Sequence, residues 1–167
     1  MKRVIIAPDS FKGSLSAVQV CETVSQQLKK RYTDIHIDSI PVADGGEGTV
    51  EAFLYALGGE KVTCQVKSPL GNDIDAYYGI LPDGSAVIEM AQASGIAIEK
   101  ANDPLKSSTY GTGQLILHAI KNGVRNIYIG IGGSATTDGG IGCLAALGVK
   151  FRNMNGEQVP LCGEGLS

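Results

Sequence analysis

The chain has 167 residues, of which 43% are hydrophobic, and a formal net charge of −3. This length and composition suit one ordinary soluble domain, or one domain and part of another. The 14 Lys and Arg residues are scattered along the chain, so the sequence lacks the large basic field that nucleic-acid binding requires, and we expect no nucleic-acid partner.

Neither a targeting segment nor a membrane span is visible. The N-terminal apolar run covers only residues 4–7, which is too short for a signal peptide, and no other stretch reaches membrane-spanning length. The four cysteines form no CxxC pair, which is typical of reduced thiols. They are Cys21, Cys64, Cys143 and Cys162. We therefore expect a cytoplasmic protein with no membrane partner.

The first third of the chain alternates strand and helix patterns. Residues 4–7 are apolar and β-branched, which predicts a strand, and a loop over residues 8–14 leads into a helix that Ser16 and Gln19 open as a capping box. Residues 34–40 alternate in polarity and predict a second strand. A glycine-rich segment over 41–48 then precedes a predicted helix over 50–57.

The rest of the chain begins with β-rich segments around residues 62–66, 74–80 and 86–90, which turns separate, and these predict an antiparallel excursion. A helix from Thr112, a strand over 127–131 and a helix around 144–147 follow. The pattern predicts an α/β fold with a parallel or mixed sheet and helices on both faces. We divide the chain into a first lobe over residues 1–59 and a second lobe over 60–167.

Two similar segments, at 44–50 and 138–144, each begin with Asp-Gly-Gly and each lead from a strand into a helix. Asp44 and Asp138 are therefore either helix caps or ligand-binding acids. Glycine near a helix start costs about 1 kcal/mol relative to alanine, so its repetition suggests that something approaches the backbone closely. Together the two segments favour a ligand site that includes the neighbouring residues Gly45, Gly46, Glu47 and Gly139.

The second of these segments follows a glycine-rich loop. Residues 130–135 formally satisfy the GxGxxA dinucleotide fingerprint, but five residues separate this match from any helical pattern, which weakens it. Amide and hydroxyl groups of this loop suit phosphate oxygens, and Asp138 is suited to bind magnesium or a hydroxyl group. The candidate phosphate-binding residues are Gly132, Gly133, Ser134, Thr136 and Thr137.

The loop after the first strand is a second candidate anion site. Lys12 and Ser14 belong to a short basic, flexible segment that could bind an anion. Asp9 and Ser10 suit either a strand-end site or a plain turn. No GxxxxGK[ST] segment occurs, which disfavours a P-loop enzyme. Glu89 is either a buried acid of the site or a charge at a strand end. His36 and His118 receive no catalytic role.

Five segments in this order resemble the glycerate kinase type I family: residues 7–17, 41–49, 87–95, 110–116 and 129–140. The resemblance covers essentially the whole chain and implies two α/β lobes, one of them flavodoxin-like, with the site between them. It further implies a bacterial enzyme that uses ATP and Mg²⁺ to phosphorylate D-glycerate. Members of this family are longer, so part of the cleft would lie outside this chain.

Phosphoryl transfer requires a protein to hold two anions and to accept a hydroxyl proton. Our hypothesis is that the loop over 134–140 binds nucleotide phosphates and that Lys12 screens a phosphate or the glycerate carboxylate. Either Asp44 or Asp138 is then the general base, and the other places Mg²⁺. Both glycerate hydroxyls would lie within reach of the same base, so the sequence leaves the 2- and 3-hydroxyl open.

Two alternatives remain at this point. The first is a fragment that binds a nucleotide or a small acid without transferring phosphate. The second is a flavin- or nicotinamide-binding oxidoreductase, which only the fingerprint match and the flavodoxin-like lobe suggest.

Overall fold

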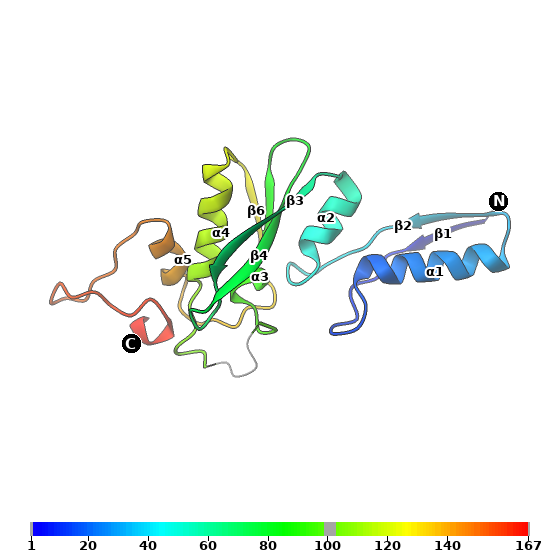
Figure 1. Cartoon of the computed structure of the whole chain (residues 1–167). Coiled ribbons are helices and arrows are strands. Elements are labelled where there is room, and N and C mark those ends of the chain that lie inside the picture. Colours follow the sequence, from blue (N-terminus) through cyan, green and yellow to red (C-terminus); the bar gives the residue numbers. More distant parts are fainter. Residues whose placement is uncertain (1, 99–102, 167) are drawn as a thin grey trace.

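The computed structural model describes residues 2–98 and 103–166 (Figure 1). Its strands form two sheets, one with β1 and β2 and one in the order β3-β4-β5-β6. The strands are β1 (Lys2–Ile6), β2 (Ile35–Ser39), β3 (Glu60–Lys67), β4 (Asp73–Ile80), β5 (Ala86–Glu89) and β6 (Ile127–Gly130). β1 and β2 are parallel, β3, β4 and β5 are antiparallel, and β5 and β6 are parallel. The expected α/β class with mixed strand directions is confirmed.

The smaller sheet carries helix α1 (Ala17–Arg31) and extends to one side of the larger sheet (Figure 1). The predicted capping box is present, since the Gln19 amide donates to Ser16 Oγ at 3.2 Å and the Ser16 amide donates to Gln19 Oε1 at 2.9 Å. The Cys21 thiol donates to the Ile6 carbonyl at 3.6 Å, so α1 packs against one face of the two strands. This face holds the few buried side chains of the unit.

The other face of β1 and β2 is open. Ile5 is 60% exposed, and Arg3 pairs with Asp38 at 2.6 Å on the same face. The guanidinium of Arg3 lowers the pKa of Asp38. Parallel strands are usually covered on both faces, and two strands with one helix bury little apolar surface. The two hydrophobic core clusters among the described residues contain no member of this unit.

We expect the amides of β1, α1 and β2 to exchange with solvent at least about tenfold faster than those of β4 and β5, because few apolar contacts oppose local opening. Hydrogen exchange followed by mass spectrometry measures both regions in one experiment. Equal protection of β1 and β5 would contradict this expectation.

The larger sheet is covered on both faces. Helix α4 (Tyr110–Lys121) packs on one face with Tyr78, Ile88 and Leu115 in a buried cluster. Helix α2 (Thr49–Leu57) packs on the other face, against β4 and β5, through Val50 and Val87. Since α2 also contacts α1, it joins the two parts of the molecule. The division of the chain at residue 59 stays a prediction.

Three shorter elements complete the fold: α3 (Ala91–Ser94), α5 (Ile141–Ala146) and the 3-10 turn η1 (Gly163–Leu166). The sequence did not predict α3, because four residues are too few to reveal a helical period. Helix α4 begins two residues before the predicted Thr112, and α5 begins three residues before 144, where glycines hide the apolar pattern. Among the described residues, no helix has both the length and the apolar character to cross a membrane.

Candidate functional site

Four loops meet at the carboxyl ends of β1, β2, β5 and β6. The loops after β1 and β2 run together, because the Val42 amide donates to the Pro8 carbonyl at 3.0 Å. The segment after β5 pairs with the loop after β6 through two bonds of 2.9 Å, from Ile96 N to the Gly133 carbonyl and from Ala135 N to the Ser94 carbonyl. Strand carboxyl ends are the usual ligand edge of an open α/β sheet.

The glycine-rich turns after β2 and β6 touch each other. The Gly132 amide donates to the Gly45 carbonyl at 2.9 Å. A Cβ atom at Gly132 would lie 2.6 Å from the Gly46 nitrogen, and one at Gly130 would lie 2.4 Å from the Gly45 oxygen. Only glycine permits this approach. The turn over 41–49 therefore meets the start of the loop after β6, at Gly130 and Gly132.

Gly132→Ala is expected to lower the free energy of unfolding by about 1–3 kcal/mol, because the new methyl group overlaps the backbone at Gly46. Urea unfolding measures the change. The matched control is Ile131→Ala at the neighbouring position, whose side chain is 74% exposed and should tolerate truncation. Equal stability of the two variants would show that the turns separate easily.

Two cavities open between these loops. The larger has a volume of about 700 Å³, and the smaller has a volume of about 410 Å³. Lys12, Gly13, Glu47 and Gln92 line both cavities, so the two form neighbouring parts of one cleft between the loop after β1 and the larger sheet. Their walls mix carboxylates, hydroxyls and one lysine with glycine backbone, which supplies hydrogen-bond donors and acceptors for a hydroxylated ligand.

Asp44 lines the larger cavity and is exposed. Its Oδ1 accepts a hydrogen bond from the Gly46 amide at 2.9 Å, which fixes the carboxylate above the turn. Within the described part of the chain no bond to Oδ2 is seen. Asp44 therefore presents a carboxylate oxygen at the cavity, where it can accept a proton or a cation.

Asp138 has the opposite environment. It is 1% exposed, and its two carboxylate oxygens accept four hydrogen bonds. Oδ2 accepts from the amide and hydroxyl of Thr109, both at 2.8 Å, and from the Gly142 amide at 3.2 Å, while Oδ1 accepts from the Gly140 amide at 3.0 Å. Asp138 lines neither cavity. Its geometry is that of a structural cap that joins the starts of α4 and α5.

The other predicted residues divide into two groups. Those that line one or both cavities are Ser10, Lys12, Ser14, Gly46, Glu47 and Gly133. Those that line neither cavity are Asp9, Gly45, Gly132, Ser134, Thr136, Thr137 and Gly139.

The second half of the loop after β6 turns away from the cavities. The Thr137 hydroxyl donates to the Pro104 carbonyl at 3.0 Å, and Gly139 lies against Leu166. Ser134 and Thr136 bond to each other, whereas Gly133 remains at the cavity. Helix α5 begins at Ile141, well beyond the GxGxxA match, so the helix geometry of a dinucleotide fingerprint is absent here.

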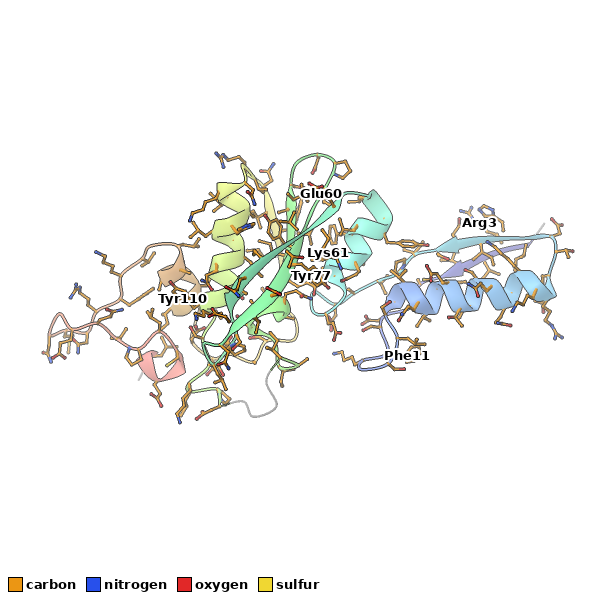
Figure 2. The ribbon with its side chains drawn as sticks, in the orientation of Figure 1. Arg3, Phe11, Glu60, Lys61, Tyr77 and Tyr110 are labelled. Carbon is orange, nitrogen blue, oxygen red and sulfur yellow. The ribbon has the colours of Figure 1, made fainter. Side chains whose placement is uncertain are left out.

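A polar cluster borders the smaller cavity on the side of β4. The Tyr77 hydroxyl and the Lys61 ammonium group both donate to Glu51 Oε1, the latter at 3.0 Å. Lys61 also lies 3.9 Å from the centre of the Tyr77 ring, and Figure 2 places both side chains beside α2. Burial and the bond to Glu51 raise the pKa of Tyr77. The phenol is therefore protonated and acts as a fixed donor.

Several cavity residues were not predicted. Tyr77 and Asp75 lie within β4, where the face of each side chain depends on pairing that a single sequence does not reveal. Gln92 lines both cavities and lies in the segment 87–95, which we noted for Glu89 and for its resemblance to the family. The family resemblance of that segment was the sequence feature that could have identified Gln92.

The described residues hold no cluster of three or more His, Cys, Asp or Glu side chains that would form a protein-only metal site. A nucleotide-bound Mg²⁺ needs less, because it keeps waters and phosphate oxygens and takes one or two carboxylates. Asp44, Glu47 and Asp75 line the larger cavity and fit this need. His118 bonds to Tyr78 at 3.1 Å and His36 bonds to Asp38 at 3.1 Å, and neither histidine lines a cavity.

Comparison with known proteins gives one consistent family. Residues 4–167 match the glycerate kinase family. The chain is 46% identical over 168 residues to glycerate 2-kinase of Escherichia coli strain K12, with 99% of this chain and 44% of the relative covered. It is 47% identical over 163 residues to glycerate kinase of Halalkalibacterium halodurans, with 95% of this chain and 43% of the relative covered.

A solved structure agrees with these matches. The chain superimposes with a TM-score of 0.82 and 46% identity on a crystal structure from Salmonella typhimurium LT2, described there as a candidate glycerate kinase 2. The match covers 99% of this chain and 45% of the other. The chain thus spans less than half the length of the relatives it matches.

Proposed function

Because the chain belongs to the glycerate kinase family, we propose that it takes part in the ATP-dependent phosphorylation of D-glycerate. The observation that carries the proposal is the cleft where the loops after β1, β2, β5 and β6 meet, with Lys12 and Asp44 on the wall of one cavity. A cavity of about 700 Å³ is within the range of small-ligand sites.

In the proposed reaction, a glycerate hydroxyl oxygen forms a bond to the γ-phosphorus of ATP while the bond from that phosphorus to the bridging oxygen of ADP breaks. The hydroxyl proton passes to the free carboxylate oxygen of Asp44. In this proposal Lys12 neutralises a phosphate or the glycerate carboxylate, and the backbone amide of Gly133, which lines the larger cavity, donates to a phosphate oxygen. Positioning and charge neutralisation provide most of the rate in such transfers.

Mg²⁺ bound to ATP supplies charge neutralisation on the transferred phosphoryl group. We assign its protein ligand to Glu47, which lines both cavities, since Asp138 is buried under four hydrogen bonds and Asp44 is assigned the proton. We extend the 2-hydroxyl preference in the name of the Escherichia coli relative to this chain.

The test is phosphorus NMR of the purified chain with ATP, Mg²⁺ and D-glycerate, with the full-length Escherichia coli relative as the positive control. The expected product is 2-phosphoglycerate. Isothermal titration calorimetry with ATP-Mg²⁺ and with D-glycerate accompanies the assay. A chain that binds neither ligand would refute the proposal, and 3-phosphoglycerate would refute the assignment of the hydroxyl.

A binding fragment is the second candidate function, and two observations favour it. The chain spans 44% of the Escherichia coli relative, and the face of β1 and β2 opposite α1 is open. Calorimetric binding of D-glycerate or ATP without a phosphorylated product would support this candidate.

A further inference from the structure

The two Asp-Gly-Gly turns share one hydrogen bond and have different relations to the helix that follows. In each turn, the Asp Oδ1 accepts from the amide two residues later, at 2.9 Å for Asp44 and at 3.0 Å for Asp138. However, α2 begins five residues after Asp44, at Thr49, whereas α5 begins three residues after Asp138, at Ile141. Asp138 therefore caps its own helix, and Asp44 makes no such bond with α2.

The N-terminus of helix α2 is capped by a side chain from strand β5. Its N-cap residue is Gly48, with φ of 92° and no side chain to accept a hydrogen bond. The amide of Val50, in the first turn, instead donates to Glu89 Oε1 at 2.5 Å. Glu89 is 0% exposed and ends β5, so the cap crosses from the sheet to the helix. A carboxylate at a helix N-terminus is also favoured by the helix dipole.

The same carboxylate reaches the cleft through a second bond. Gln92 Nε2 donates to Glu89 Oε2 at 3.1 Å, and Gln92 lines both cavities. Glu89 thus fixes two things at once: the start of α2, which follows the turn that carries Asp44, and the side chain of Gln92. Val87, two residues earlier on β5, packs against Val50 and brings helix and strand together at this point.

We infer that Glu89 is a positioning residue that caps α2 from β5 and so leaves the second carboxylate oxygen of Asp44 free for the ligand. This inference rests on the proposed function for the identity of the ligand only. The comparison with Asp138 supports it, because the Asp that caps its own helix is buried with all its bonds made, whereas the Asp relieved of capping faces a cavity.

The important property of Glu89 is an acceptor oxygen at the Val50 amide. Burial raises the pKa of the Glu89 carboxyl, and the nearby charge of Glu51 raises it further. Glutamine has the same shape and retains one acceptor oxygen, so Glu89→Gln should keep the cap. Glu89→Ala removes the acceptor and leaves the Val50 amide without a partner.

The experiment compares Glu89→Ala, Glu89→Gln and the control Ile88→Val in the 167-residue chain. Ile88 is adjacent on β5, is 0% exposed and faces the α4 side of the sheet, so its truncation weakens the fold without touching α2. Hydrogen exchange of the Val50 amide is measured by NMR, together with calorimetric binding of D-glycerate. The same NMR samples give the carboxyl carbon shift of Asp44.

In Glu89→Ala, we expect Val50 exchange to be about tenfold faster than in the control. The Asp44 carboxyl shift should move, and D-glycerate should bind about tenfold more weakly than in the control. Glu89→Gln should restore all three values. Unchanged Val50 exchange in Glu89→Ala would overturn the inference. A Glu89→Gln variant with the same values as Glu89→Ala would also overturn it. If wild type binds no D-glycerate, the glycerate-binding part of the proposed function fails, and Val50 exchange together with the Asp44 carboxyl shift still decides the role of Glu89.

Discussion

Asp44→Asn should reduce the turnover of D-glycerate by about 10²–10⁴-fold, because an amide cannot accept the hydroxyl proton. The glycerate KM should change little, since asparagine keeps the oxygen that bonds to the Gly46 amide and therefore keeps the turn. The measurement is steady-state turnover of D-glycerate, made with a protein for which phosphorus NMR has first detected the phosphorylated product. A loss in kcat with unchanged KM identifies a group that acts in the transition state.

The control for this variant is Asp83→Asn, which makes the same chemical change at an aspartate that also accepts from the amide two residues later. Asp83 Oδ1 accepts from the Ser85 amide at 2.9 Å, as Asp44 Oδ1 does from Gly46, but Asp83 lies in the turn before β5 and lines neither cavity. Its turnover should equal that of wild type. Near-normal turnover of Asp44→Asn would remove the base assignment.

The sequence predicted the elements well wherever a local signal determined them. The capping box at Ser16 placed the start of α1, and the helix predicted over 50–57 matches α2 within one residue. Each of these features depends on residues that are close in the chain. The predicted starts of α4 and α5 were less accurate, because the first turns of both helices contain glycine and the start of α4 is fixed by Asp138 from another segment.

The site was predicted only in part, because the two Asp-Gly-Gly segments are indistinguishable by pattern. Which Asp faces the cavity depends on where the following helix begins and on Glu89, which lies 45 residues beyond Asp44 in the chain. Likewise, Tyr77 reaches the cleft because of its register in β4. Contacts between distant segments therefore determine which side chains reach the cavities. The local sequence pattern identifies only the candidate residues.

Asp138→Asn is expected to lower the free energy of unfolding by about 2–4 kcal/mol, in contrast to Asp44→Asn, which should change it by less than about 0.5 kcal/mol. The amide nitrogen of asparagine must replace one oxygen that now accepts from backbone amides, and it would face a donor with no acceptor in reach. Urea unfolding with an unchanged m-value measures the difference.

Turnover separates this structural role from a catalytic one. Without urea, and at a temperature well below its unfolding transition, Asp138→Asn should retain most of the wild-type kcat. The reason is that Asp138 lines neither cavity and is 1% exposed. A stable Asp138→Asn protein with turnover reduced by a hundredfold would instead place the base or the metal ligand at Asp138. Both variants make the same substitution in the same Asp-Gly-Gly sequence. Their opposite effects on turnover and stability would therefore result from the free carboxylate oxygen of Asp44 and the fully bonded carboxylate of Asp138.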